Sequence, residues 1–247
     1  SYSGQILVLT YPSIGNYGVP DTNAEDTHGI PVNVESHRIH ATALVVADHS
    51  EQYSHWAATQ TLANWLVGND VPAIAGVDTR QLTQIIRDHG TLLARIVVLS
   101  DASPLPVFSD PNLRNLVADV APSEPRTFVG SGAGENLAPR ILVIDCGMKF
   151  NQLRILLNSG TASVTVVPWD YDFLADDTDC KYDGIFVSNG PGDPKMASGT
   201  IQNLRRAMNT RSNRPIFGIC LGHQLLALAA GFSSYKLKYG NRGHNQP

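Results

Sequence analysis

The sequence has 247 residues, 43% of them hydrophobic and 16% charged, with a formal net charge of -4 at pH 7. Length and composition predict a globular protein with one large core or two moderate ones, and the scattered Lys and Arg residues argue against binding to nucleic acid. Apolar runs of about ten residues are too short for the roughly 20 that cross a bilayer, and no signal sequence opens the chain, so we expect a cytoplasmic protein without a membrane partner.

The cysteine content argues against two further classes. Cys146, Cys180 and Cys220 are odd in number and widely spaced. Such spacing fits neither a disulfide framework nor a CxxC metal site. We therefore expect no disulfide and no bound metal.

The first half of the chain predicts a mixed α/β domain over residues 1–121. Strands are expected at residues 5–10, 42–46, 73–77 and 92–99, and helices at 56–67 and 82–88. Asp78 lies just before the second helix, where a carboxylate can accept hydrogen bonds from free backbone N–H groups. Because this half lacks a glycine-flanked nucleophile, we expect a structural or docking role.

A stretch rich in Pro, Gly and Ser follows at residues 122–139. It shows neither helical nor strand periodicity, and this composition is typical of a linker. The sequence therefore predicts a boundary there, with a second domain over residues 140–247.

The second domain alternates apolar strands with helices. Strands are expected at residues 140–145, 164–167, 184–187 and 216–219, and helices at 150–157, 200–208 and 221–230, the last capped by Gly231. Strands that are apolar on both faces and separated by helices predict a mainly parallel sheet covered on both sides, hence an α/β fold. Ligands bind such sheets at the carboxyl ends of the strands, where the glycine loop 188–194 is expected.

Cys220 lies between Gly218 and Gly222, directly after an apolar strand and directly before a helix. This is the layout of the nucleophile elbow of Gly-x-Ser-x-Gly hydrolases with sulfur in place of oxygen. A helix N-terminus beside the sulfur favours the thiolate, which is the attacking form. The alternative for an isolated Gly-x-Cys-x-Gly motif is a buried cysteine in an ordinary strand-to-helix turn.

Three motifs in the second half resemble those of the class I, triad-type glutamine amidotransferases. They are SNGPGDP at residues 188–194, FGICLGHQLLA at 217–227 and KYGNRGHNQP at 238–247. In the first half, SYSGQ at 1–5, LTYPSIGNYG at 9–18 and GVDTRQLT at 76–83 resemble the small subunit, or amino-terminal glutaminase region, of glutamine-dependent carbamoyl-phosphate synthase. The residues at 239–247 and 167–170 resemble eukaryotic pyrimidine-pathway versions more than bacterial ones.

The resemblance implies a function and a set of site residues. The family hydrolyses glutamine through a cysteine thioester and delivers ammonia to an ATP-grasp carbamoyl-phosphate synthetase, fused or separate, which alone uses ATP and Mg; no cofactor is expected in this region. By resemblance, Cys220 is the nucleophile, and the backbone N–H groups of Leu221 and of Gly190 or Gly192 stabilise the oxyanion. Gln224 and Ser1 match positions that contact glutamine.

The sequence departs from the family pattern in one respect. A cysteine nucleophile needs a base and a group that orients it, which the family supplies as a His-x-Glu pair after the elbow. The His-x-Glu in this sequence is His49-Ser50-Glu51, which precedes the elbow by a whole domain. We therefore interpret the 247 residues as part of a longer protein and expect them to be inactive alone.

Two alternatives remain open. The chain could be a catalytically silent docking or regulatory module of the same complex, or an unrelated α/β-type cysteine hydrolase. Cys220 favours an enzyme over a silent module, because silent relatives commonly replace the nucleophile. The family-like first half argues against an unrelated hydrolase.

Overall fold

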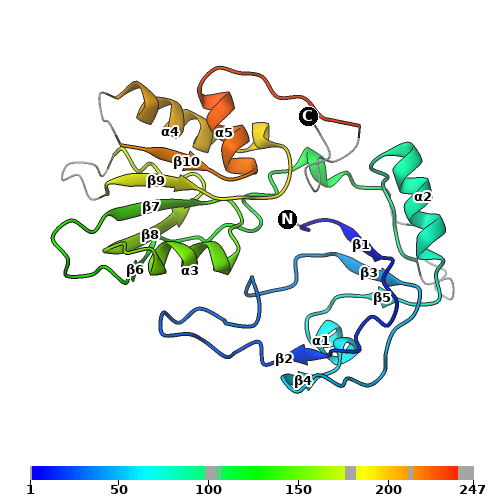
Figure 1. Ribbon diagram of the computed structural model, residues 1–247. Helices are drawn as coiled ribbons and strands as arrows, with labels where there is room; N and C mark the ends of the chain where they lie inside the picture. The colour runs from blue at the N-terminus through cyan, green and yellow to red at the C-terminus, as the bar shows by residue number, and fades with distance from the viewer. Residues whose placement is uncertain (1, 98–104, 106, 176–181, 211–213, 239–247) are drawn as a thin grey trace. The chain divides into compact units, whose positions relative to one another are not determined.

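The computed structural model describes residues 2–97, 105, 107–175, 182–210 and 214–238 (Figure 1). The chain divides into two compact units. Among the described residues, unit 1 consists of Thr22–Arg38 and Arg114–Ser234, and unit 2 of Tyr2–Asp21, Ile39–Leu113 and residues 235–238. No helix among the described residues is long and apolar enough to cross a membrane.

Unit 1 contains a five-stranded sheet with the strand order β10-β9-β7-β8-β6. The strands are β6 (Arg126–Val129), β7 (Arg140–Asp145), β8 (Ser163–Pro168), β9 (Gly184–Val187) and β10 (Ile216–Gly218). Four of them are parallel, and β6 pairs antiparallel with β8 at one edge. The α/β class and the four parallel strands of the second half are confirmed.

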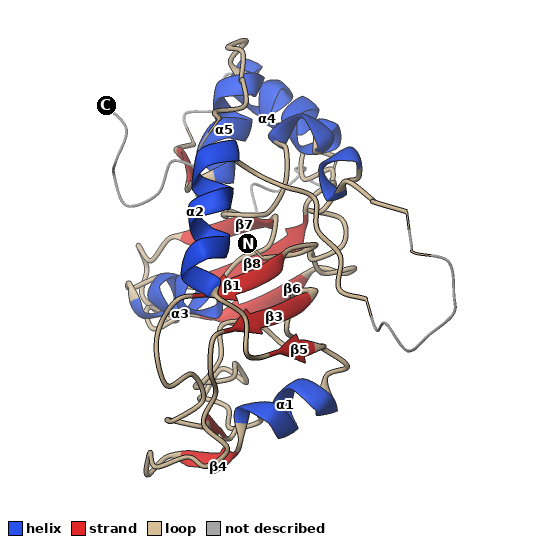
Figure 2. Ribbon diagram, turned by 90° about the vertical axis from the view of Figure 1, so that its right-hand side faces the viewer, coloured by secondary structure: helices blue, strands red, loops and turns tan. Residues whose placement is uncertain are grey.

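Helices cover both faces of this sheet (Figures 1 and 2). Helices α4 (Ser198–Asn209) and α5 (Leu221–Ala229) bury Leu204 and Leu225 against Leu142 and Ile144 of β7. Helix α3 (Phe150–Asn158) buries Leu153 and Leu157 against the opposite face, which includes Val143. Successive β7 residues therefore alternate between two cores, as side chains of a strand buried on both faces must.

The segment predicted as a linker differs from that expectation. Within 122–139, Arg126–Val129 forms the edge strand β6, and the backbone N–H of Gly132 donates to the Thr161 carbonyl at 2.9 Å. A Cβ on Gly130 or Gly132 would lie 2.2 or 2.3 Å from a backbone oxygen of the turn at 160–161. The glycines that indicated flexibility instead allow the backbone to pack closely on that turn.

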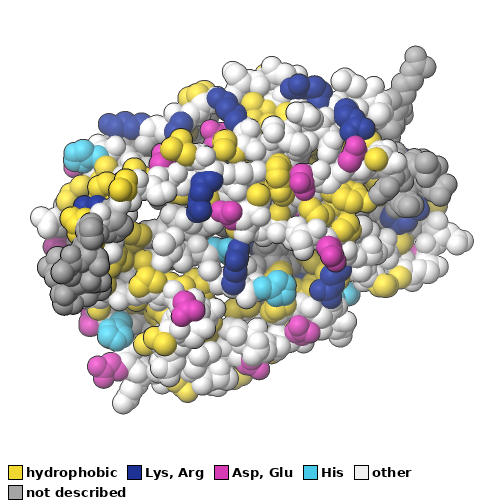
Figure 3. Space-filling model, turned by 180° about the vertical axis from the view of Figure 1, so that it is seen from behind, with side chains coloured by type: hydrophobic (Ala, Val, Ile, Leu, Met, Phe, Trp, Pro, Cys, Tyr) yellow, Lys and Arg dark blue, Asp and Glu magenta, His cyan; other side chains and the backbone are white. Residues whose placement is uncertain are grey.

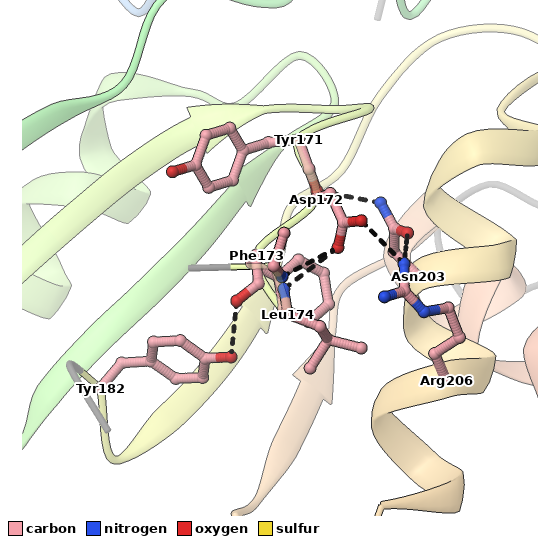
Figure 4. Close-up of polar contacts among 8 residues, drawn as sticks. Tyr171, Asp172, Phe173, Leu174, Tyr182, Asn203 and Arg206 are labelled. Carbon is pink, nitrogen blue, oxygen red and sulfur yellow. Dashed lines mark hydrogen bonds and ion pairs between the residues drawn. The ribbon is translucent and has the colours of Figure 1, made fainter. Parts of the chain in front are cut away.

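A turn after β8 is fastened to α4 by polar groups (Figure 4). Asp172 accepts hydrogen bonds from the N–H groups of Leu174 and Ala175, and its other oxygen lies 2.9 Å from Nη1 of Arg206. Asn203 Nδ2 donates to the Tyr171 carbonyl at 3.0 Å. The Arg206 hydrogen bond is the main reason why the pKa of Asp172 lies below its usual value.

Unit 2 is smaller. Strands β1 (Ile6–Leu9), β3 (Ala43–Val46) and β5 (Ala73–Ile74) form a parallel sheet, and β2 (Val19–Pro20) pairs antiparallel with β4 (Ala58–Gln60). Its buried core cluster consists of Leu44, Val46 and Leu66. Helices α1 (Leu62–Gly68) and α2 (Thr79–His89) complete the unit, with a 3₁₀ turn at Pro111–Leu113.

Two expectations for the first half need correction. The helix predicted at 56–67 begins only at Leu62, because 58–60 is paired as β4 and the Thr61 side chain caps the helix. Residues 92–97 of the strand predicted at 92–99 have no regular secondary structure, and 98–99 lie outside the described residues. An apolar run gives strand propensity but cannot supply a partner strand. Asp78 caps α2 as predicted, accepting from the Gln81 N–H at 2.9 Å.

Candidate active site

Cys220 forms the apex of the turn between β10 and α5. Its backbone angles are φ 53° and ψ -108°, a region that side-chain-bearing residues rarely adopt, and its thiol is exposed. Such a conformation costs of order 1–3 kcal/mol and persists only where the surrounding structure imposes it. The turn is therefore the strained, exposed elbow expected from the sequence, and not a buried packing site.

The two flanking glycines are required by close backbone approach. A Cβ on Gly218 would lie 2.5 Å from the Gly222 carbonyl carbon, and one on Gly222 would lie 2.2 Å from the Val187 carbonyl oxygen. Both obstacles are backbone atoms, which cannot rotate away. Any side chain at either position would push α5 off the sheet, so the Gly-x-Cys-x-Gly pattern has a direct steric cause.

The N-terminus of α5 is left open beside the sulfur. Cys220 is the N-cap residue, and its side chain makes no capping hydrogen bond. The N–H groups of Gly222 and Gln224 donate to the carbonyls of Ile219 and Cys220, whereas the Leu221 N–H has no hydrogen-bond acceptor within the described part of the chain. An unsatisfied helix-terminal N–H beside a nucleophile can stabilise negative charge on a reacting oxygen.

The 188–194 loop reaches the same edge of the sheet. Strands β9 and β10 are parallel neighbours, so the loop after β9 and the elbow after β10 lie side by side. A Cβ on Gly190 would lie 2.2 Å from the Cys146 carbonyl oxygen and 2.5 Å from Cδ2 of Leu221. Gly192 has φ +83°, which favours glycine. The structure thus brings Gly190 against the residue that follows the nucleophile.

The loop 145–148 after β7 packs against Gly190 and accepts a hydrogen bond from Asn189. Sequence reasoning missed this role. The Asp145 carboxylate accepts hydrogen bonds from the N–H groups of Gly147 and Met148, both at 2.7 Å. The Gly147 carbonyl accepts one from Asn189 Nδ2 at 3.2 Å. Burial outweighs these hydrogen bonds and raises the pKa of Asp145 above its ordinary value. The available signal was Gly147, two residues after the end of β7.

Cys146 differs from Cys220 in its exposure to solvent. It is fully buried in the core beneath α5. Burial, reinforced by the neighbouring Asp145 charge, raises the pKa of its thiol far above the ordinary range. A thiol that cannot ionise is inert, so the described part of the chain holds one accessible cysteine and one that serves packing.

The remaining predicted site residues are placed as follows. Gln224 is exposed one turn after Cys220 in α5. Ser1 and residues 239–247 lie outside the described residues. Within the described ranges, no group of three His, Cys, Asp or Glu residues could hold a metal ion. Figure 3 shows Lys and Arg side chains interspersed with Asp and Glu on the face it draws.

Comparison with known protein families assigns both halves of the chain. Residues 1–96 match the family described as "Carbamoyl-phosphate synthase small chain, CPSase domain", and residues 142–247 match "Glutamine amidotransferase class-I". The second match contains Cys220, Gly190 and every other site residue predicted in the second half.

Curated relatives align with the whole chain but are longer. "Multifunctional protein CAD" of Squalus acanthias is 50% identical over 248 residues, and the chain spans 10% of its length. "Carbamoyl phosphate synthase arginine-specific small chain" of Saccharomyces cerevisiae is 49% identical over 249 residues, with 59% of its length covered. "Carbamoyl-phosphate synthase [ammonia], mitochondrial" of Aquarana catesbeiana is 45% identical over 248 residues, with 16% covered. All of this chain is covered in each case.

Proposed function

Since the chain belongs to the carbamoyl-phosphate synthase small-chain family and carries its class I glutamine amidotransferase domain, we propose that it hydrolyses glutamine and supplies ammonia for carbamoyl phosphate synthesis. The product feeds pyrimidine synthesis, with arginine synthesis as the other possible destination. The observation that carries the proposal is the strained, exposed Cys220 between two glycines that admit no side chain.

In the proposed reaction, the Cys220 thiolate attacks the side-chain carboxamide carbon of glutamine. The C–N bond breaks and ammonia leaves with a proton from a general acid, giving a γ-glutamyl thioester that water then hydrolyses to glutamate. The negative charge that develops on the carbonyl oxygen is stabilised by the Leu221 N–H and by an N–H of Gly190 or Gly192. Gln224 and Ser1 hold the substrate.

The base that activates Cys220 is not identified within these 247 residues. We propose that a His-x-Glu pair elsewhere in the full protein supplies it, so that residues 1–247 alone hydrolyse glutamine negligibly. Robust glutaminase activity from that polypeptide would contradict this part of the proposal.

The synthetase that consumes the ammonia is the proposed partner, as a fused region or a separate ATP-grasp subunit. ATP and Mg are used there, and no cofactor or metal is needed at Cys220. We place residues 1–121 in the docking role, residues 140–247 in the glutaminase role, and the assembly in the cytoplasm.

The test is Cys220→Ala in the full-length protein. Glutamine-dependent carbamoyl phosphate formation is expected to fall by about 10³-fold or more, because the covalent route is lost. Formation from added ammonia is expected to stay unchanged. A glutamine-like electrophile should label Cys220 and spare Cys146, with glutamine protecting. Unchanged glutamine-dependent activity in the variant would refute the proposal.

A second candidate is a catalytically silent module of the same complex. "Carbamoyl-phosphate synthase [ammonia], mitochondrial" aligns along the whole chain, and its name specifies ammonia as the nitrogen source. A relative of this kind favours the silent module. The intact wild-type protein separates the two candidates: a silent module supports carbamoyl phosphate formation from ammonia but not from glutamine.

A further inference from the structure

We propose that Glu35 is a positioning residue of this active site, acting through the start of α3 and the loop 145–148 on Gly190. The inference rests on the proposed function, because it assigns Gly190 to the oxyanion site. Glu35 lies in the segment Thr22–Arg38, which comes from the first half of the sequence but belongs to unit 1.

Helix α3 does not cap itself. Its N-cap residue, Lys149, makes no capping hydrogen bond through its side chain. Glu35 supplies the cap from 116 residues away: its Oε2 accepts the Asn151 N–H at 2.9 Å, and its carbonyl accepts the Phe150 N–H at 3.2 Å. A carboxylate at this position satisfies free N–H groups and complements the positive end of the helix.

The rest of the segment is fastened along the same helix. The His37 ring packs edge-on against Phe150 with centroids 4.6 Å apart. One turn further on, Arg154 pairs with Asp26 at 3.2 Å, and both side chains are largely shielded. Ile30 is buried in the core beneath α3. Glu35 is therefore held at the end of the helix that faces the 145–148 loop, and Asp26 is held away from it.

The loop 145–148 joins this helix end directly to the oxyanion loop. Only Lys149 separates it from Phe150, the first residue of α3. On its other side, the Cys146 carbonyl faces Gly190 so closely that no Cβ would fit, and the Gly147 carbonyl holds Asn189. A helix start that frays would release this loop and let the N–H donors move away from the oxygen that they must stabilise.

The experiment compares Glu35→Ala, Glu35→Gln and Asp26→Ala in the full-length protein. Asp26→Ala is the matched control, because it removes a more shielded contact between the same segment and the same helix. Glu35→Ala is expected to lower the glutaminase kcat about tenfold while KM changes less than about twofold. Glu35→Gln, which keeps an oxygen acceptor, should restore kcat to within about threefold, and Asp26→Ala should keep it within about twofold.

Equal kcat for wild type and Glu35→Ala, or an equal fall in Glu35→Ala and Asp26→Ala, would overturn the inference. Amide hydrogen exchange provides a readout that does not depend on activity. Exchange at residues 147–151 should be about tenfold faster in Glu35→Ala than in wild type. If wild-type protein hydrolyses no glutamine, the proposed function fails, and unchanged exchange in Glu35→Ala independently overturns the role of Glu35 at this loop.

Discussion

The helices of the two units begin in different ways. In unit 2, α1 and α2 are capped by the side chains that precede them: Thr61 accepts the Asn64 N–H at 3.1 Å, and Asp78 accepts the Gln81 N–H at 2.9 Å. In unit 1, the N-cap residues of α3, α4 and α5 make no capping hydrogen bond through their side chains. Local side chains therefore cap the helix starts in unit 2, whereas in unit 1 a distant segment caps α3 and the start of α5 is left open.

The open helix start of α5 lies at the proposed active site. Ser, Thr and Asp are the residues that ordinarily cap a helix from the N-cap position. The chain instead has a thiol there, in a strained conformation, beside the open N–H of Leu221. An active site needs donors that the protein itself has not satisfied, so the large core of unit 1 must hold α5 in place without a cap.

The largest effect expected from this comparison is that of Gly222→Ala. A methyl group there meets the Val187 carbonyl oxygen at 2.2 Å, so α5 must move off the sheet, and we expect a loss of more than about 3 kcal/mol in the unfolding free energy of unit 1. Denaturant unfolding followed by the fluorescence of Trp169, the tryptophan of unit 1, measures it once Trp56 and Trp65 of unit 2 have been replaced by Phe.

Gly68→Ala is the matched control in unit 2. Gly68 ends α1, and a methyl group on it would meet no described atom within 4 Å, so the same substitution should be neutral or stabilise the unit by less than about 1 kcal/mol. Similar losses in both variants would show that the elbow is no more crowded than an exposed helix end.

The sequence predicted some of these features much better than others. The strands at 140–145 and 184–187 match the structure because their apolar runs are buried on both faces and depend little on which partner they find. Cys220 was identified because the tight turn has no room for a Cβ at positions 218 and 222, and the two glycines required there are visible in the sequence.

Features that depend on distant partners could not be predicted. β6 is mostly exposed at a sheet edge and lies in a Gly- and Pro-rich stretch, so only its pairing with β8 defines it. β5 was predicted over residues 73–77, but it is exposed and only two residues long, so its presence was predicted and its length was not. The contact between Gly190 and Leu221 follows from strand order, and that between Glu35 and α3 spans 116 residues. Neither strand order nor a distant cap leaves a periodic signal in a single sequence.

An intermediate effect is expected at the helix caps. Thr61→Ala and Asp78→Ala should each lower the unfolding free energy of unit 2 by about 1 kcal/mol, because each exposes a helix N–H that had an acceptor. Lys149→Ala, at the N-cap of α3, should change that of unit 1 by less than about 0.5 kcal/mol. Denaturant titrations monitored by far-ultraviolet circular dichroism compare them, and equal losses at all three positions would remove the distinction between the units.

The smallest effect concerns the ion pair between Arg140 and Asp183, which ties the start of β7 to the residue before β9. Hydrogen bonds from the Arg140 side chain and N–H hold the pKa of Asp183 below its usual value. Because the folded pKa is depressed, the stabilisation is present above the unfolded pKa and is lost as pH falls through the folded value.

Both side chains are nearly half exposed, so solvent screening limits the contribution to a few tenths of a kcal/mol, and Asp183→Asn should cost about that much at pH 7. The cost should disappear once the pH falls below the folded pKa of Asp183, where the wild-type carboxyl is protonated as well. In unit 2, Asp88→Asn removes an ion pair that is more exposed and joins adjacent residues, and we expect a smaller change from it. A larger change there would show that unit 2 also depends on charge contacts that its local sequence does not reveal.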